Sequence, residues 1–310
     1  MRRTLNRVRH GWLAPRRWPT RRAAIVVGTT AVLSVALLLI VGSASGTLPG
    51  SNFESGDGDL VAGDSGGTFD WNAPTPEPIS CPSATPGAGT NCGTDLAGPG
   101  DNAFGAGTTE DTPDPTVVNE VIPPNKSDLT RFYVNQENAG GADFLYLAWE
   151  RLSNLAVGTA DMDFELNQKS KLGGNGATPV RSAGDILITF DFIAGKGFPP
   201  SLVSLTWLTR SRTGQCFSSA SPPCWGNAMI QLAEGAVNST IVHDDNPPPV
   251  PGTDLPAQTF GEAGIDLAAI SQGKCRSVRS IFLKSRSTAG FGSELKDFIA
   301  PIPVKISTCA

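Results

Sequence analysis

Histidine is almost missing from this chain of 310 residues, which contains only His10 and His243. The HExxH pattern of zinc proteases is absent, and no two cysteines have the CxxC spacing of zinc and thiol-redox sites. Both kinds of site depend on those ligands at those spacings. The sequence therefore gives little support to a zinc enzyme or a thiol oxidoreductase. We expect no cofactor, and calcium is the one ion that other features below bring into consideration.

Acidic residues are missing from the first 45 positions, where eight arginines lie within residues 1–22 and residues 23–41 carry no charge. As a helix that rises about 1.5 Å per residue, the uncharged run spans roughly 28 Å, close to the hydrocarbon thickness of a bilayer. Basic residues on one side of such a run predict a cytoplasmic N-terminus. We therefore predict a basic cytoplasmic segment at 1–22, an apolar helix at 23–42, and export of the remaining chain.

The sequence allows two fates for the apolar helix at 23–42. The small residues at 42–46 resemble a signal-peptidase site, whereas the length of the apolar run suits a retained signal anchor. The expected location is therefore extracytoplasmic, either as a single-pass protein of the cell membrane or as a secreted protein. The membrane is an expected partner through this N-terminal segment.

The exported part is acidic, because 16 basic and 29 acidic residues follow position 45 and give a formal net charge of −13. Nucleic-acid binding needs a basic face and is not expected. All six cysteines lie in this part, and an even number in an oxidising compartment predicts three disulfides. Fifteen pairings exist, of which the simplest joins neighbours in sequence: Cys81–Cys92, Cys216–Cys224 and Cys275–Cys309.

Composition divides the exported part at about residue 117. Residues 46–116 are rich in Gly, Pro, Ser, Thr and Asp, which is typical of a linker, but their cysteine pair and aromatic residues predict that they pack partly on the domain. Residues 117–310 contain short apolar runs separated by turn residues. We expect strands at 132–134, 144–151, 162–167, 185–193, 202–210, 228–233, 240–243, 264–267, 280–285 and 304–308, and helical turns at 263–270 and 292–298. Such a pattern predicts an all-β fold, a single jelly-roll-like β-sandwich with long loops.

Eight runs of residues carry a resemblance to a known family. They are 123–133 (PPNKSDLTRFY), 145–151 (LYLAWER), 162–165 (MDFE), 184–188 (GDILI), 224–227 (CWGN), 260–263 (FGEA), 283–287 (LKSRS) and 296–301 (KDFIAP). In these runs the chain resembles an uncharacterised family of secreted and cell-surface β-sandwich modules of Gram-positive bacteria, over residues 52–309. Its members often precede prealbumin-like or immunoglobulin-like stalk repeats. The resemblance implies a surface location and a β-sandwich, and it implies no catalytic residues.

The run Gly-Asp-Ser-Gly-Gly at 63–67 matches the nucleophile signature of trypsin-like proteases and, more loosely, the elbow of α/β-hydrolases. A trypsin-like enzyme needs a histidine upstream, and only the cytoplasmic His10 precedes Ser65. An elbow needs a strand before the serine and a helix after it, which the flanking residues do not favour. We therefore expect an ordinary loop here, and we expect His243, next to Asp244 and Asp245, to be an exposed loop residue.

Two groups of carboxylates are candidates for a metal or for acid–base chemistry. They are Glu54, Asp57, Asp59 and Asp64 within eleven residues, and Asp161, Asp163 and Glu165 on one face of an alternating strand. Calcium takes oxygen ligands of this kind, and a glycosidase needs only two acids at the right separation. Neither group matches an EF-hand loop or a nonapeptide calcium repeat, so we expect solvated acids in both, and alternation by itself explains the second row.

The aromatic residues suggest two uses, a stacking platform for sugars or the interior of the sandwich. The residues concerned are Tyr133, Tyr146, Trp149, Trp207 and Trp225. Large aromatic side chains dominate such interiors, so we expect them in the core. The resulting hypothesis is a non-catalytic extracytoplasmic surface protein with a binding or structural role and a glycan or protein ligand. The alternatives are a carboxylate-dependent, glycosidase-like hydrolase and a calcium-stabilised carbohydrate-binding module.

Overall fold

The structure is a computed structural model that describes ten stretches of the chain. They are 47–73, 78–81, 87–122, 124–154, 159–193, 200–211, 214–230, 234–245, 254–271 and 274–308. All of them belong to one compact unit covering residues 42–310. The apolar helix predicted at 23–42 lies outside the described residues. Within the described stretches, no helix has the length and apolar character needed to span a bilayer.

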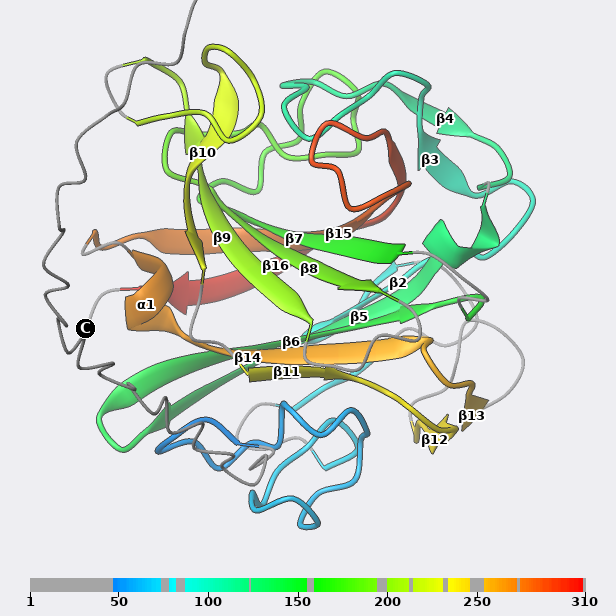
Figure 1. Ribbon diagram of the computed structural model, residues 1–310, viewed down its shortest axis with the longest axis vertical. Coiled ribbons are helices and arrows are strands. Elements are labelled where there is room, and N and C mark those ends of the chain that lie inside the picture. The colour runs from blue at the N-terminus through cyan, green and yellow to red at the C-terminus, as the bar shows by residue number, and fades with distance from the viewer. Residues whose placement is uncertain are drawn as a thin grey trace, which may run out of the picture. The chain divides into compact units, whose positions relative to one another are not determined.

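Strands make up 48% of the structure and helical residues only 4%, and the strands form two facing sheets in a sandwich-like arrangement (Figure 1). The first sheet has six strands in the order β1-β2-β5-β6-β14-β11, all antiparallel. They are β1 (Gly87–Ala88), β2 (Cys92–Thr94), β5 (Leu129–Ala139), β6 (Ala142–Arg151), β14 (Phe260–Asp266) and β11 (Glu234–Val237). The β5–β6 hairpin turns at Gly140 and Gly141, whose positive φ angles suit a two-residue connection.

The second sheet has eight strands in the order β10-β9-β8-β7-β15-β16-β3-β4. They are β10 (Cys224–Ile230), β9 (Ser201–Leu208), β8 (Ile186–Ile193), β7 (Thr159–Asn167), β15 (Ser277–Arg286), β16 (Leu295–Ser307), β3 (Asn102–Phe104) and β4 (Val117–Asn119). Outside the two sheets lie the small β12 (Val242–His243) and β13 (Asp254–Leu255) pair, the 3-10 turn η1 (Asn125–Ser127) and the helix α1 (Leu267–Ser271).

The hydrophobic core lies between the two sheets, because alternate residues of each strand point to the same face. Leu147 and Trp149 of β6 and Phe164 and Phe190 of the opposite sheet are buried there. The rings of Trp149 and Phe190 meet edge to face, with 5.4 Å between their centroids. Pairing between strands that are far apart in the sequence therefore fixes where the loops and their side chains lie.

Residues 47–73 form a layer of loops against the outer face of the six-stranded sheet (blue in Figure 1). The ring of Phe53 stacks on Tyr146 at 4.3 Å between centroids, and Trp71 stacks on Tyr133 at 5.6 Å. All four side chains are buried. The segment whose composition resembles a linker is thus held on the domain by apolar burial.

The outer face of the eight-stranded sheet corrects one expectation. Asp161, Asp163 and Glu165 of β7 do not face solvent, since each is at most 1% exposed. Alternation assigned these acids correctly to one face of the strand, but loops cover that face. The prediction of a solvated row was wrong. Alternation along a strand shows which residues share a face, but it does not show whether loops cover that face.

Basic side chains compensate the acids beneath those loops. Lys284 Nζ lies 2.5 Å from Oε2 of Glu110 and 2.8 Å from Oε2 of Glu165. Arg181 pairs with the same Glu165 oxygen at 2.8 Å, and Arg286 Nε lies 2.6 Å from Oδ2 of Asp163. Glu110 belongs to the segment between β3 and β4, so the ion pairs also tie that segment to the sheet.

Each expected strand overlaps a strand of the structure, which is mostly longer. Of the strand expected at 240–243, only 242–243 is extended, as β12, and residues 231–233 of the strand expected at 228–233 lie outside the described residues. The helical turn expected at 292–298 was wrong, because residues from 295 onward form β16. Only the second half of the turn expected at 263–270 is helical, as part of α1. In both places, pairing with a neighbouring strand overrides the local pattern.

Two of the three expected disulfides are present in the described chain. Cys81 bonds Cys92, and Cys216 bonds Cys224. Cys275 is also disulfide-bonded, and its expected partner Cys309 lies outside the described residues. Disulfides of this kind indicate an oxidising, extracytoplasmic environment.

The buried ion pairs generate a prediction about stability. Replacing Lys284 by methionine keeps the volume of the side chain but leaves Glu110 and Glu165 buried with less compensation. We expect Lys284→Met to lower the free energy of unfolding by about 3–5 kcal/mol. Urea denaturation measures this change through the midpoint of the transition.

Lys305→Met is the matched control, because Lys305 is an exposed lysine of β16. We expect it to change the free energy of unfolding by no more than about 0.5 kcal/mol. Equal effects of the two substitutions would contradict the energetic role assigned to the buried pairs.

Candidate functional site

The candidate site is built by the acidic loop, defined as residues 54–70. Its two ends meet, since the backbone N–H of Glu54 donates to the carbonyl of Phe69 at 2.8 Å and Phe53 forms a bridge with Phe69. Gly58 and Gly63 have φ angles of +84° and +94°, which residues with a side chain rarely adopt. These glycines let seventeen residues close into a compact loop.

Glu54 organises the loop from inside. Its carboxylate accepts backbone N–H bonds from Gly63 at 2.6 Å, Ser65 at 2.8 Å and Gly67 at 2.8 Å. Burial would raise the pKa of Glu54, but these three donors lower it below its usual value. Three backbone N–H groups of the Gly-Asp-Ser-Gly-Gly run therefore surround the carboxylate of Glu54 as hydrogen-bond donors.

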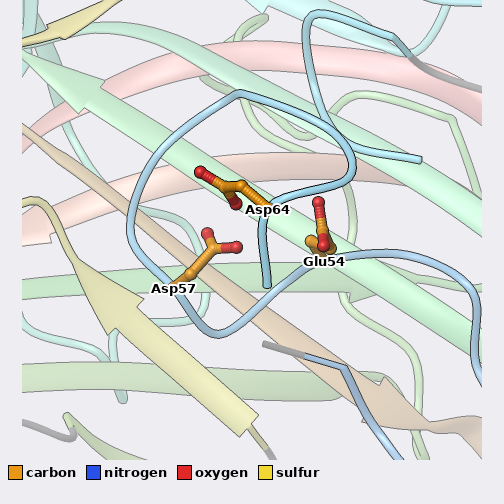
Figure 2. Close-up of side chains that lie close together, drawn as sticks. All are labelled: Glu54, Asp57 and Asp64. Carbon is orange, nitrogen blue, oxygen red and sulfur yellow. The ribbon is translucent and has the colours of Figure 1, made fainter. Parts of the chain in front are cut away.

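Five carboxylates of the loop gather into two overlapping groups. Glu54, Asp57 and Asp64 form the first group, drawn in Figure 2, and Asp57, Asp59 and Asp70 form the second. In each group, one oxygen of every carboxylate lies within 4.8 Å of the others. Asp57 belongs to both groups, so the five side chains make one continuous cluster.

Two buried carboxylates form the floor of this cluster. Asp70 is fully buried, and its Oδ2 has no hydrogen-bond partner. Glu262 of β14 is fully buried as well, and it accepts bonds from the N–H of Gly58 at 2.7 Å and from Nε1 of Trp71 at 2.9 Å. Strand β14 thus supplies an acid beneath a loop that lies about two hundred residues earlier in the chain.

Electrostatics at the floor are unfavourable without a cation. Burial and the charge of Asp57 raise the pKa of Asp70 to about 10. Burial and the charge of Asp70 raise the pKa of Glu262 well above its usual value. Among the described residues, no lysine or arginine forms an ion pair with Glu262 or with any acid of the loop.

The arrangement suits a hard cation. Every candidate ligand is an oxygen, and calcium takes six to eight oxygen ligands in flexible geometry. Asp64 at the rim is exposed whereas Asp70 and Glu262 are buried, so the cluster is open to solvent on one side. A cation bound here would keep coordination positions for water or for an oxygen of an external ligand.

The other candidate residues do not join the cluster. Ser65 donates its hydroxyl to Asp57, and no histidine contacts it among the described residues. His243 is exposed on β12, with Nδ1 3.1 Å from Asp254 and Nε2 3.5 Å from Asp245. The loop expected around Ser65 and the exposure expected for His243 agree with the structure, but His243 lies on a short strand and not in a loop.

The aromatic residues considered as a sugar platform are all buried. They are Tyr133, Tyr146, Trp149, Trp207 and Trp225, and none is more than 3% exposed. Tyr133 hydrogen-bonds Glu150 at 3.1 Å, and the rings of Trp207 and Trp225 contact each other at 5.0 Å between centroids. These side chains belong to the interior, as expected.

Two surface cavities contain pairs of acids in their lining. One holds Asp143 and Asp266 beside Lys274, and the other holds Glu120 and Glu294 beside Lys296. None of the buried acids whose pKa is raised lines either cavity; they are Asp70, Asp95, Asp101, Glu110, Asp128, Glu150, Asp161, Asp185, Glu262 and Asp297. A glycosidase requires a carboxyl group with a raised pKa inside its cleft, and neither of these two cavities is lined by one of the acids just named.

Sequence reasoning found part of the site and missed its floor. Glu54, Asp57, Asp59 and Asp64 stand out as a local cluster, and Asp70 follows only six residues later. Glu262 carries no local signal, because its position under the loop follows from the pairing of β14 with β6.

Comparison with known proteins adds no relative. No family model, curated protein or solved structure matches this chain. The resemblance to surface modules of Gram-positive bacteria therefore stays a prediction. The geometry of the described residues alone carries the functional argument.

The donors around Glu54 generate a prediction about the loop. Glu54→Gln removes the negative charge and leaves only one oxygen to accept three N–H bonds. With chelator present, we expect amide hydrogen exchange at Ser65 and Gly67 to become at least about tenfold faster, since losing a charged acceptor costs about 1.5–3 kcal/mol. Hydrogen-exchange NMR or mass spectrometry resolves these amides.

Asp114→Asn serves as the control, because Asp114 is an exposed aspartate outside the loop. It should leave exchange at Ser65 and Gly67 unchanged. Unchanged exchange in Glu54→Gln would show that another interaction holds the loop closed.

Proposed function

We propose that the protein is a non-catalytic extracytoplasmic surface protein that binds calcium at the acidic loop and acts in surface binding or structure. Its domain is a jelly-roll-like β-sandwich that belongs with the secreted and cell-surface modules of Gram-positive bacteria. The segment 1–42 either anchors it in the membrane or is removed on secretion. The outer compartment supplies both the oxidising conditions for its disulfides and the calcium.

The observation that carries the proposal is the floor of the cluster. Asp70 Oδ2 is buried without a hydrogen-bond partner, and the neighbouring ligands are carboxylates. A buried carboxylate without a donor or a cation is costly, so native proteins rarely keep one. A calcium ion would supply the compensating positive charge, and several of these oxygens could coordinate it at once.

The open rim supports a binding role as well as a structural one. Asp64 is exposed, and Asp57 and Asp59 are partly exposed. A calcium ion coordinated from the floor would present its remaining positions outward, where the hydroxyl or carboxylate oxygens of a glycan or a protein could bind. Because tryptophan and tyrosine side chains are buried in the described part of the chain, recognition would depend on oxygen coordination and not on aromatic stacking.

The hydrolase alternative has weaker support. The described cavities with paired acids hold lysines beside them, and Glu294 is ion-paired with Lys296 at 2.9 Å. Its decisive test is activity: a panel of polysaccharide substrates should release no reducing ends in the presence of the protein. Release that is lost in Asp143→Asn or Asp266→Asn would favour a glycosidase.

Calcium removal generates the prediction that tests the proposal. Extracellular modules bind calcium with dissociation constants of about 10⁻⁴–10⁻³ M, and at 10⁻⁴ M a 1 mM concentration adds about 1.4 kcal/mol of stability. For a domain of this size we expect the melting temperature to be about 3–6 °C higher in 1 mM calcium than in chelator. Differential scanning calorimetry measures the shift.

Variants assign this shift to the loop. Asp57→Asn removes the carboxylate shared by both groups and should take away a large part of the calcium-dependent rise. In chelator it should melt no lower than the wild type, because it relieves repulsion among like charges. Asp114→Asn should behave as the wild type, and an undiminished rise in Asp57→Asn would refute calcium binding at the loop.

A ligand screen addresses the binding role. A glycan array probed with the protein in 1 mM calcium and again in chelator separates calcium-dependent binding from background. Binding that vanishes in chelator and in Asp57→Asn would place the ligand at the open rim.

A further inference from the structure

A second group of carboxylates lies together at a different place in the fold. It consists of Asp95, Asp101 and Asp297, called here the buried aspartate trio, and one oxygen of each lies within 4.8 Å of the others. Asp95 follows β2, Asp101 precedes β3, and Asp297 lies on β16. Their exposed fractions are 2%, 1% and 0%. Two parts of the sequence that are distant from each other, residues 95–101 and Asp297, thus bring three acids to one point away from solvent.

Backbone donors fix the orientation of each member. The N–H of the following residue donates to Oδ1 in all three: from Leu96 at 2.8 Å, from Asn102 at 2.8 Å and from Phe298 at 2.7 Å. The N–H of Leu129 also donates to Asp297 Oδ2 at 2.6 Å. The acids are therefore held in place by the fold itself, whether or not anything is bound between them.

Some oxygens at this place have no partner. Asp101 Oδ2 has none, although its side chain is almost completely buried. The neighbouring Asn102 Oδ1 and Asp128 Oδ1 are also without a hydrogen-bond donor, and Asp128 is 1% exposed. Three buried acceptors without donors, next to three carboxylates, favour a cation or a hydrogen-bond donor at this place.

The described part of the chain offers no ion-paired basic side chain to the trio. Among the described residues, none of the ion pairs includes Asp95, Asp101, Asp128 or Asp297. Burial and then the charge of Asp101 raise the pKa of Asp297 well above its usual value, and burial and the charge of Asp95 raise the pKa of Asp101 to about 8. This contrasts with the buried acids of β7, which have Lys284 and Arg286.

We propose that Asp95, Asp101 and Asp297 form a second calcium site, enclosed in the protein, that ties the segment around β2 and β3 to β16. The ligand set is oxygen only, which excludes soft-metal preference. Calcium fits better than magnesium, which usually keeps several waters and therefore suits an enclosed site poorly. Asp128 is a further candidate ligand, since burial and also its charge raise the pKa of all three acids, and the side-chain amide of Asn102 donates to Asp95 at 3.2 Å. The site stands on residues separate from the acidic loop and does not depend on the function proposed for it.

The test counts calcium ions in the full chain, purified in detergent, by equilibrium dialysis with radioactive calcium. We expect two ions per chain in the wild type, one in Asp101→Asn, one in Asp70→Asn and none in the double variant. Asp297→Asn should repeat the result of Asp101→Asn. Asp114→Asn, the matched control, should keep both ions.

A second readout separates the two sites. Trp71 contacts the acidic loop through Glu262 and Asp70, so its excitation should sensitise the emission of terbium bound there. Trp71→Phe should remove most of this emission, which identifies its source. We expect Asp101→Asn to leave the Trp71-sensitised emission within about twofold of wild type, and Asp70→Asn to abolish it.

The outcomes are distinct. Two ions retained by Asp101→Asn, or one ion in the wild type that only Asp70→Asn removes, would overturn the second site. One ion that only Asp101→Asn removes would support the second site and overturn calcium binding at the loop. Misfolding is not expected to obscure the result, because the substitution relieves charge repulsion; the melting temperature of Asp101→Asn in chelator should equal or exceed that of the wild type.

Discussion

Burial of carboxylates away from both water and basic side chains is the constraint on which the N-terminal part of the domain depends. A buried charge is tolerated only when a partner compensates it. On the outer face of the eight-stranded sheet, Lys284 and Arg286 supply that compensation from within the chain. Beneath the acidic loop and at the buried aspartate trio, the described chain supplies N–H donors but no ion-paired basic side chain. The described chain therefore compensates one set of buried acids with its own basic side chains and leaves the other two sets without them.

Packing makes the acidic loop rigid before any ligand arrives. Phe53 and Trp71, at the two ends of the loop, stack on Tyr146 and Tyr133 of the central hairpin. Between these anchors, the loop closes around Glu54 through three backbone donors. A site whose ligands are already positioned loses little conformational entropy on binding. The same anchors explain why a segment with linker-like composition is part of the domain.

The sequence predicts the sandwich better than it predicts the sites. Alternation in β7 and β8 correctly indicates strands with one apolar face. The same alternation misleads about Asp163 and Glu165, because periodicity contains no information on the loops that cover a sheet. Glu54, Asp57 and Asp59 are visible as a local cluster. Glu262 and Asp297 are not, since only strand pairing brings them to acids that are far away in the sequence.

The difference in solvent exposure gives the two proposed ions different roles. The trio joins segments near the two ends of the described chain, so it is complete only after β16 has paired. A ligand that binds only the folded state adds its binding free energy to folding stability, and an enclosed ion acts in that way alone. An ion at the acidic loop also stabilises its segment, but its outer positions stay accessible to exchange and to external oxygens. On these proposals, the enclosed site would act in folding and the open one in recognition.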